Sequence, residues 1–344
     1  MKRITNHSQR LITFFLAIML LMAAGSGLPL PSLIASSMMR FFMNIVLVLA
    51  LLPMLRAGMG VNYGLPIGIL AGLFGMCLAL EFDLTGWAAF LTSCLFAILT
   101  AIPFGLLYGH LLRRVRGQEE IAGLFLGFSA VFLMSFFWAA APFHNAGLVW
   151  PIGGLGLRPT IGLKTSFGGV LSEFGAIHAG GVSFPVGGLL IMAVPVLLMV
   201  WFFRTEIGQA ISALGENELF AGLSGIQTER YRRLAVILST VTAALGICIY
   251  AQSYGFVELY EAPLMTAFPA ASSILLGGSG SSRTSVAQVF MGTLLFQTVY
   301  VLSGPLANQL VMPDLSEIIR TIVTNGVILY ALLETGKGER YEAV

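Results

Sequence analysis

Charged residues are scarce in this sequence. Only 10% of its 344 residues are Asp, Glu, Lys or Arg, whereas 57% are hydrophobic, and the mean hydropathy is +0.89. A water-soluble domain is typically about a quarter charged, because its surface has to be solvated. The length alone would suggest two soluble domains, but this composition cannot cover a soluble surface of that size. The sequence therefore predicts an integral membrane protein.

The sequence also lacks the residue groupings of several other protein classes. Its formal net charge is only +2, so it has no broad basic face, and we expect no nucleic-acid partner. Its cysteines, Cys77, Cys94 and Cys248, stand singly in apolar runs, which argues against a disulfide framework and a zinc cluster. Its four histidines form no H-x-x-x-H pair, so a metalloenzyme is not expected.

No nucleotide-binding or hydrolytic motif is present. The sequence contains no G-x-x-x-x-G-K-[ST] segment, and Gly336-Lys337-Gly338 lacks both the preceding glycine and the following Ser or Thr. No G-x-S-x-G segment or pair of carboxylates suggests hydrolysis. We therefore expect no catalytic residue, no metal site and no cofactor in this chain.

What the sequence does contain is a succession of long hydrophobic runs. A helix that crosses a bilayer needs about 20 mainly apolar residues. Ten runs come close enough to this length to be predicted as spans, which makes residues 1–344 a single all-α, polytopic transmembrane domain. The ten are residues 11–30, 36–55, 60–80, 87–112, 121–142, 183–203, 234–254, 264–279, 285–304 and 314–333.

Two of these spans leave an alternative open. Residues 11–30 follow a basic N-terminus and end in small residues, as a signal peptide does, but further apolar runs follow at once and favour a retained first helix. Residues 264–279 are short and contain Pro269. They fit a broken or re-entrant helix as well as an ordinary short span.

The basic residues of the loops predict the orientation, because cytoplasmic loops carry an excess of Lys and Arg. With the N-terminus inside, fourteen basic residues lie on the cytoplasmic side, and only Arg158 and Lys164 lie clearly outside. Ten spans then place both termini in the cytoplasm. The fourteen are Lys2, Arg3, Arg10, Arg56, Arg113, Arg114, Arg116, Arg204, Arg230, Arg232, Arg233, Arg283, Lys337 and Arg340.

Two loops are long enough to have structure of their own. Residues 143–182 form a Gly-rich external loop, in which an amphipathic stretch from Phe167 to Phe174 favours a segment lying on or re-entering the outer membrane surface. A plain connecting loop is the alternative. Residues 204–233 form a cytoplasmic loop with clearer signals.

In the cytoplasmic loop, Asn217 suits an N-cap, Glu218 a first helical turn and Gly225 the position after a helix. One short helix is predicted between Asn217 and Gly225. Its apolar residues, which fall largely on one side, are Leu219, Phe220 and Leu223. A helix of about seven residues is marginal alone in water. We therefore expect it to dock, either on the membrane end of its own protein or on another protein.

The stretch GQAISALGENELFAGLSGI resembles the cytoplasmic coupling loop of the branched-chain amino acid, ribose and nucleoside permease family of bacterial ABC importers. The family pattern is G-x-x-x-x-A-x-G-x-N-x-x-A-A-x-x-x-G-I. The residues that fit it are Gly208, Ala213, Gly215, Asn217, Ala221, Gly225 and Ile226. The resemblance implies that the residues coupling this chain to an ATPase are Gly215, Glu216, Asn217, Leu219, Phe220, Ala221, Leu223 and Gly225.

Other segments, within residues 58–305, resemble the same family. In ILLGGSGSSRTSVAQVFMGTLLF, Gly277, Gly278 and Gly292 match, but Ser282-Arg283 stands where the family has a second glycine pair. The stretch GVNYGLPIGILAGLFG, with Asn62, Gly64 and Gly68, resembles the nucleoside and simple-sugar branch, and so does GQEEIAGLFLGF at 117–128. Glycine patterns alone are weak evidence, because small residues recur wherever membrane helices pack closely.

This resemblance implies the permease subunit of a type II ABC importer in the bacterial inner membrane. Such a subunit forms the translocation pathway with a second copy of itself or a related permease. Two cytosolic ABC ATPase subunits, which hold ATP-Mg, drive it, and an extracytoplasmic solute-binding protein delivers the solute.

The solute and the energy source leave alternatives. A membrane interior with few charges favours a small hydroxylated solute (a simple sugar, nucleoside or riboflavin-like compound) over branched-chain amino acids, since a zwitterion costs more to desolvate. An ion-coupled secondary transporter is the second alternative.

Polar side chains inside the spans are candidates for lining the pathway: Asn62, Tyr63, Ser129, Gln252, Ser272, Ser273 and Gln297. Alternatively, each makes an interhelical hydrogen bond. Glu317 and Arg320 are three residues apart on the last span, where a structural ion pair is expected. Trp87, Trp138 and Trp201 stand at span ends and are interpreted as interfacial anchors.

Overall fold

Almost all regular structure in the described chain is helical. The computed structural model describes residues 2–150, 156–179, 182–278, 284–310, 318–323, 325–326 and 329–330. Within them, the strands number four and have three residues each. The all-α fold class predicted from the sequence is confirmed.

The helices follow the hydrophobic runs. The longer ones are α1 (Lys2–Gly25), α2 (Leu30–Leu49), α4 (Leu65–Leu80), α5 (Gly86–Leu112), α6 (Glu119–Ala140), α8 (Val186–Phe202), α11 (Thr228–Tyr254), α12 (Ala262–Leu276) and α13 (Val286–Leu310). The shorter ones are α3 (Leu52–Arg56), the 3-10 helix η1 (Arg113–Val115), α7 (Val170–Glu173), α9 (Glu206–Glu216) and α10 (Glu218–Leu223).

Each predicted span before residue 305 coincides with one of the longer helices, and the last, 314–333, lies largely outside the described residues. In the described part, five helices are long and apolar enough to cross a bilayer, and α8 with α9, bent by 70°, makes a sixth if counted as one span. Helices α4 and α12, with 16 and 15 residues, are shorter than the usual span of about 20. The protein is a polytopic helical membrane protein, and the total of ten spans stays a prediction.

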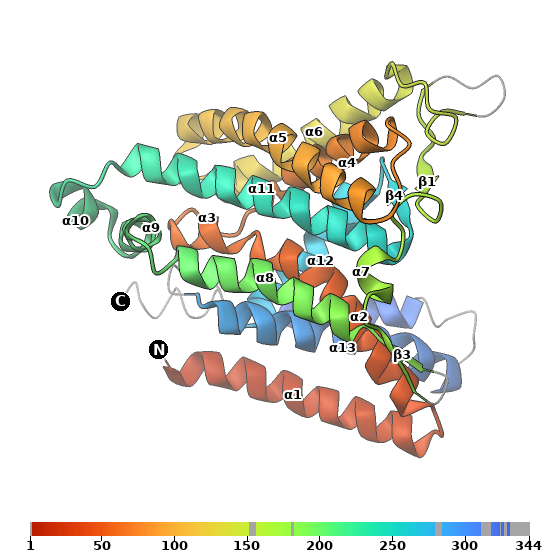
Figure 1. The fold of residues 1–344 in the computed structure, drawn as a ribbon. Helices are drawn as coiled ribbons and strands as arrows, with labels where there is room; N and C mark the ends of the chain where they lie inside the picture. Colours follow the sequence, from red (N-terminus) through yellow and green to blue (C-terminus); the bar gives the residue numbers. More distant parts are fainter. Residues whose placement is uncertain are drawn as a thin grey trace.

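The long helices run side by side, with different features at their two ends (Figure 1). Helices α9 and α10 and the beginning of α1 lie at one end, and β1 and β4 lie at the other. Helix α4 packs against both α5 and α11, and α13 packs against α2 and α12. Because α4 is hydrophobic all round, it is buried on nearly every side at the centre of this arrangement.

Glycines allow α4 and α11 to touch backbone to backbone. A Cβ on Gly68 would lie 2.7 Å from the Cβ of Ala243, and one on Gly72 would lie 2.6 Å from the carbonyl oxygen of Ala244. Any larger side chain at these positions would force the helices apart. Such small-residue seams are how membrane helices approach closely, so the packing of this region accounts for Gly68 without a functional role.

The loop at 143–182 is folded, not a plain connection. Its strand β1 (Thr160–Gly162) pairs antiparallel with β4 (Phe256–Glu258), and β2 (Ile177–Ala179) pairs with β3 (Val182–Phe184). The Gln252 side chain accepts a hydrogen bond from Leu171 N at 3.0 Å, and its backbone oxygen accepts one from Gly169 N at 2.7 Å. These contacts tie the loop to the end of α11, and the side chain of Phe167 in the loop is fully buried.

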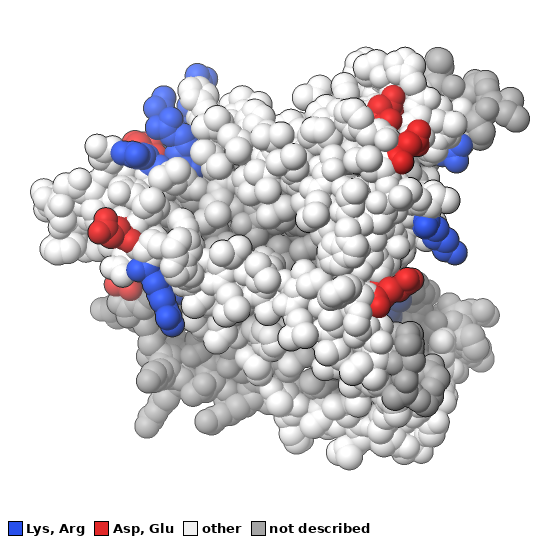
Figure 2. Space-filling view, in the orientation of Figure 1, with Lys and Arg blue, Asp and Glu red and all other residues white. Residues whose placement is uncertain are grey.

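The visible face shown in Figure 2 carries its charges at two opposite ends, with a wide uncharged band between them. Large apolar side chains point outward on the helices, including Leu107, Phe136 and Leu197, which are 63%, 77% and 64% exposed. An exposed apolar surface of this kind needs lipid or another protein to cover it.

The tryptophans divide into two groups. Trp87 and Trp201 are exposed, as membrane-interface anchors are. The interpretation of Trp138 as an anchor is wrong, because its side chain is fully buried against Phe74 and Phe137. The reason is that the chain folds back over the end of α6, where Leu157 N donates to the Trp138 carbonyl at 2.9 Å.

Two further expectations concern the spans. Residues Ala262–Leu276 form a single helix that contains Pro269, without a break in those residues. The ion pair expected between Glu317 and Arg320 on the last span stays a prediction, because Glu317 lies outside the described residues. The Arg320 guanidinium lies 4.9 Å from the ring centre of Tyr300, and Arg40 of α2 lies 4.4 Å from the same ring.

Candidate functional site

The segment 204–233 contains two short helices, α9 and α10, where one was predicted, and the beginning of α11. Helix α9 follows α8 after a sharp bend, and its N-cap is Thr205, whose hydroxyl accepts a hydrogen bond from Gly208 N at 3.3 Å. Ile211 and Leu214 of α9 are buried against the membrane end of the protein. Sequence reasoning missed this helix, although Thr205 followed by Glu206 is a helix-start signal.

Two glycines hold α9 close to the rest of the chain. A Cβ on Gly208 would lie 2.5 Å from the Cα of Phe203, so glycine permits the tight bend after α8. A Cβ on Gly215 would lie 2.8 Å from Gly58 N, so the end of α9 touches the backbone that follows α3. Gly215, which the resemblance places among the coupling residues, is a close-packing residue inside α9.

Helix α10 has both of the predicted caps. The Asn217 side chain accepts a hydrogen bond from Phe220 N at 2.9 Å. At the other end, Ile226 N donates to the Ala221 carbonyl at 3.0 Å and Gly225 N donates to the Gly222 carbonyl at 3.1 Å. This is the Schellman pattern, and it requires the left-handed conformation that Gly225 adopts, with φ of +85°. The short helix predicted between Asn217 and Gly225 is confirmed.

The outward side of α10 is apolar and uncovered. Leu219, Phe220 and Leu223 are 75%, 66% and 81% exposed, whereas Ala221 on the opposite side is 1% exposed. These three side chains therefore do not pack on the described part of their own protein, whereas Ile211 and Leu214 of α9 do. Three large apolar side chains on one exposed turn of a capped helix are typical of a docking surface.

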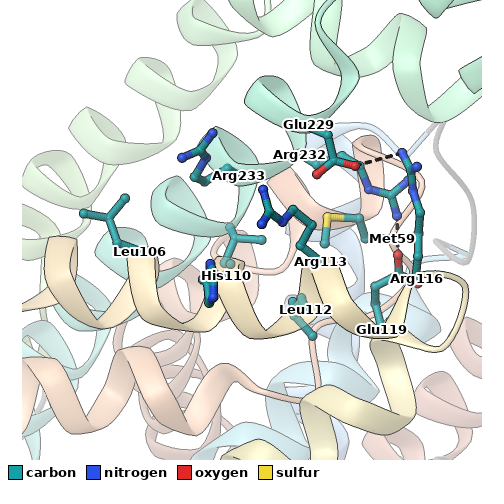
Figure 3. A pocket seen from close by; sticks show the side chains of 12 residues that line it. Met59, Leu106, His110, Leu112, Arg113, Arg116, Glu119, Glu229, Arg232 and Arg233 are labelled. Carbon is teal, nitrogen blue, oxygen red and sulfur yellow. Dashed lines mark hydrogen bonds and ion pairs between the residues drawn. The ribbon is translucent and has the colours of Figure 1, made fainter.

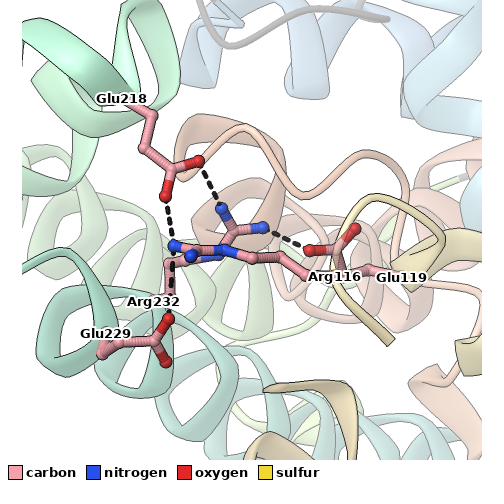
Figure 4. A network of polar contacts seen from close by, with 5 residues as sticks. All are labelled: Arg116, Glu119, Glu218, Glu229 and Arg232. Carbon is pink, nitrogen blue, oxygen red and sulfur yellow. Dashed lines mark hydrogen bonds and ion pairs between the residues drawn. The ribbon is translucent and has the colours of Figure 1, made fainter. Parts of the chain in front are cut away.

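An ionic network fixes the position of α10 (Figure 4). The Glu218 carboxylate pairs with Arg116, which follows η1, and with Arg232 of α11 at 3.0 Å. Arg116 also pairs with Glu229 at 3.2 Å. Arg232 pairs in addition with Glu119 of α6, and these two side chains are 12% and 6% exposed.

The network joins α6 and α11 to α10, and it was not predicted from the sequence. The one signal of it in the sequence is the acidic pair in the segment GQEE at 117–120, which belongs to a stretch that resembles the family. Long-range ion pairs of this kind cannot be read from sequence spacing, because Arg116 and Glu218 are 102 residues apart.

A chain of polar contacts continues from this network toward the interior. Glu120, next to Glu119, accepts a hydrogen bond from Val61 N at 2.5 Å. The neighbouring Asn62 donates to Ser239 at 2.9 Å and accepts from the Tyr108 hydroxyl at 2.8 Å. The base of α10 is thereby connected through α6 to the segment that begins α4.

The predicted pathway residues are dispersed over different helices. Asn62 and Gln252 are buried and hydrogen-bonded between segments. Ser272 and Ser273 donate back to the carbonyl groups of Phe268 and Pro269 within α12. The remaining positions are Ser129, exposed on α6, Gln297, buried in α13, and Tyr63, half-buried beside a crevice between α6 and α12.

The apolar helices define a multi-pass membrane protein, and the capped helix α10 presents an uncovered apolar side at one end of it. Residues 33–332 match the family described as branched-chain amino acid transport system / permease component, and the chain belongs to that family. It is accordingly a multi-pass protein of the bacterial inner membrane.

Three curated relatives are similar over long stretches. The fructose import permease protein FruG of Bifidobacterium longum is 24% identical over 281 residues, covering 79% of this chain and 74% of the relative. The nucleoside ABC transporter permease protein NupC of Lactococcus lactis is 28% identical, covering 53% of this chain and 51% of the relative. The ribose import permease protein RbsC of Bacillus subtilis is 27% identical, covering 51% and 52%. The chain thus spans about half the length of the latter two relatives.

Proposed function

We propose that this chain is the pathway-forming permease subunit of an ATP-driven importer and that α10 is the helix through which an ATPase drives it. The observation that carries the proposal is the exposed apolar side of α10, with Leu219, Phe220 and Leu223 held outward on a doubly capped and ion-paired helix. A transporter that works alone has no need of such a surface at its cytoplasmic end. This argues against the ion-coupled secondary transporter.

The partners follow from this assignment. Two cytosolic ABC ATPase subunits hold ATP-Mg and bind α10, and a second copy of the chain or a related permease completes the pathway. An extracytoplasmic binding protein docks on the opposite end, where β1 and β4 join the 143–182 loop to the 255–263 turn. In this orientation the start of α1 is cytoplasmic, because it lies at the same end as α10 (Figure 1).

For the solute, we propose a small hydroxylated compound such as a simple sugar or a nucleoside. Three relatives are named as permeases for fructose, nucleosides and ribose, which supports this choice. The alternative is a branched-chain amino acid, which the family description names.

The test is uptake into vesicles that contain the purified chain with or without its ATPase and binding protein. We expect uptake of labelled pentoses or nucleosides only when the ATPase, the binding protein and ATP are all present. Uptake driven by a proton or sodium gradient without any ATPase would refute the importer. ATP-dependent uptake of leucine, but of no sugar or nucleoside, would refute the solute class and leave the importer standing.

A further inference from the structure

A charged pocket of about 170 Å³ opens between α5 and α11, at the end of the molecule that carries α10 (Figure 3). Four arginines line it: Arg113, Arg116, Arg232 and Arg233. The other titratable groups that line it are His110, Glu119 and Glu229. The pocket is distinct from the apolar side of α10 and from the predicted pathway residues, none of which lines it.

The positive charge of the pocket is only partly neutralised. Arg116 and Arg232 are engaged by Glu218, Glu229 and Glu119. Arg113 and Arg233, by contrast, have no acidic partner within 4.0 Å among the described residues. They come from two different helical segments and face one pocket (Figure 3). Like charges that converge on one pocket repel each other unless an anion lies between them.

The chemistry of the four arginines selects the kind of anion. Guanidinium groups donate paired hydrogen bonds in a planar geometry that matches phosphate and carboxylate oxygens. The pocket is large enough for a phosphate group. Arg116 and Arg232, which are held in place by their acidic partners, line it.

The rest of the pocket selects the carrier of that phosphate. Leu106 and Val236 form its apolar side, and Leu106 is 44% exposed. The exposed apolar side of α5 continues from there toward the middle of the helix through Ile102 and Leu99, which are 40% and 55% exposed. A ligand that fits has an anionic group at the arginines and a hydrocarbon chain along α5. Basic pockets between helices at the cytoplasmic surface suit the headgroups of anionic lipids.

We propose that this pocket binds a phosphate group, carried by an anionic phospholipid of the inner leaflet. Because Arg116 and Arg232 hold α10 through Glu218, the bound lipid also stabilises the position of the docking helix. This last consequence rests on the proposed function, whereas the binding itself requires only the orientation of the chain in the membrane.

The experiment compares lipid retention by the purified full-length chain in detergent, using native mass spectrometry with phosphatidylglycerol, phosphatidylcholine or inorganic phosphate. The pocket variant is Arg113→Gln with Arg233→Gln. Its matched control is Arg114→Gln with Arg230→Gln, which removes the same charge from neighbouring exposed arginines that do not line the pocket. Thermal unfolding of both variants checks that neither change disturbs the fold.

We expect the wild type and the control to retain phosphatidylglycerol in preference to phosphatidylcholine. The pocket variant should bind phosphatidylglycerol about thirtyfold more weakly, since each of the two basic residues near a headgroup contributes about fivefold. Equal retention of phosphatidylglycerol by the pocket variant and the control variant, or an equal loss of it in both, would refute the proposed binding site. Retention of inorganic phosphate that depends on Arg113 and Arg233, without preferential retention of phosphatidylglycerol, would overturn the assignment to a lipid. None of these outcomes depends on transport activity.

Discussion

The replacement of Phe220 by alanine tests the docking surface most directly. Burying a large apolar side chain contributes about 1.5–3 kcal/mol. Phe220 is 66% exposed in the isolated chain, so about two thirds of that contribution, roughly 1–2 kcal/mol, remains for a partner to gain by covering it. The Phe220→Ala variant should therefore bind the ATPase about five- to thirtyfold more weakly. Phe220→Asp should bind more weakly still, because a carboxylate would be buried at the interface.

The same exposure predicts that the chain itself is hardly affected. A substitution at an exposed position usually changes the free energy of unfolding by no more than about 0.5 kcal/mol. Membrane insertion and thermal stability of the permease should therefore match the wild type. The assay is a titration of the detergent-solubilised permease with the ATPase, together with solute-stimulated ATP hydrolysis of the complex.

A matched control is Phe132→Ala on α6, where the side chain is 70% exposed on the apolar band of the molecule. It removes the same group from a surface that lies away from α10, and ATPase binding should stay unchanged. Wild-type ATPase affinity and hydrolysis in both Phe220 variants would refute the reasoning, because the exposed side of α10 would then be left uncovered in the complex.

Three further predictions concern the cap, the network and the outer end. Gly225→Val should weaken ATPase binding, because the φ of +85° strains a β-branched residue by about 1–3 kcal/mol. Gly225→Asn should be tolerated, because Asn adopts this conformation more readily and no atom lies within 4 Å of the added Cβ. Equal binding of the ATPase by both variants would contradict this. Arg232→Ala should lower the free energy of unfolding by about 3–5 kcal/mol, because it leaves the buried Glu119 unpaired. Adding Glu119→Ala should restore part of that loss in thermal unfolding, and a further loss would be inconsistent with a buried pair. Lys164→Glu, on the exposed part of the outer loop, should reduce the stimulation of ATP hydrolysis by the binding protein and leave basal hydrolysis unchanged; normal stimulation would place the docking site elsewhere.

The sequence predicts the helices well because the bilayer imposes a simple rule on length and hydrophobicity. It also predicts α10, because caps such as Asn217 and Gly225 act within a few residues and leave a local signal. The same local rule explains one failure. Trp138 stands at the end of an apolar run like an interfacial anchor, but residues near Leu157 fold back over it, and nothing in the run itself reports that contact.

The polar residues show more clearly that contacts between distant parts of the chain leave no local signal in the sequence. Asn62 has the appearance of a pathway residue in the sequence, since an amide inside an apolar run is costly without a partner. The structure supplies partners from 46 and 177 residues away, the Tyr108 and Ser239 hydroxyls. Pairings at such separations depend on which helices become neighbours. The network of Glu218, Arg116 and Arg232 was missed for the same reason.

Helix α11 runs between the two faces of the membrane as one uninterrupted helix. It is continuous from Thr228 to Tyr254, and its 27 residues give a length of about 40 Å. Arg232 near one end is tied to the docking helix, and Gln252 near the other end holds the backbone of Leu171 in the outer loop. We therefore expect a displacement of α10 to be passed along α11 to the opposite surface, and α4 to move with α11, because Gly68 and Gly72 of α4 pack directly on it.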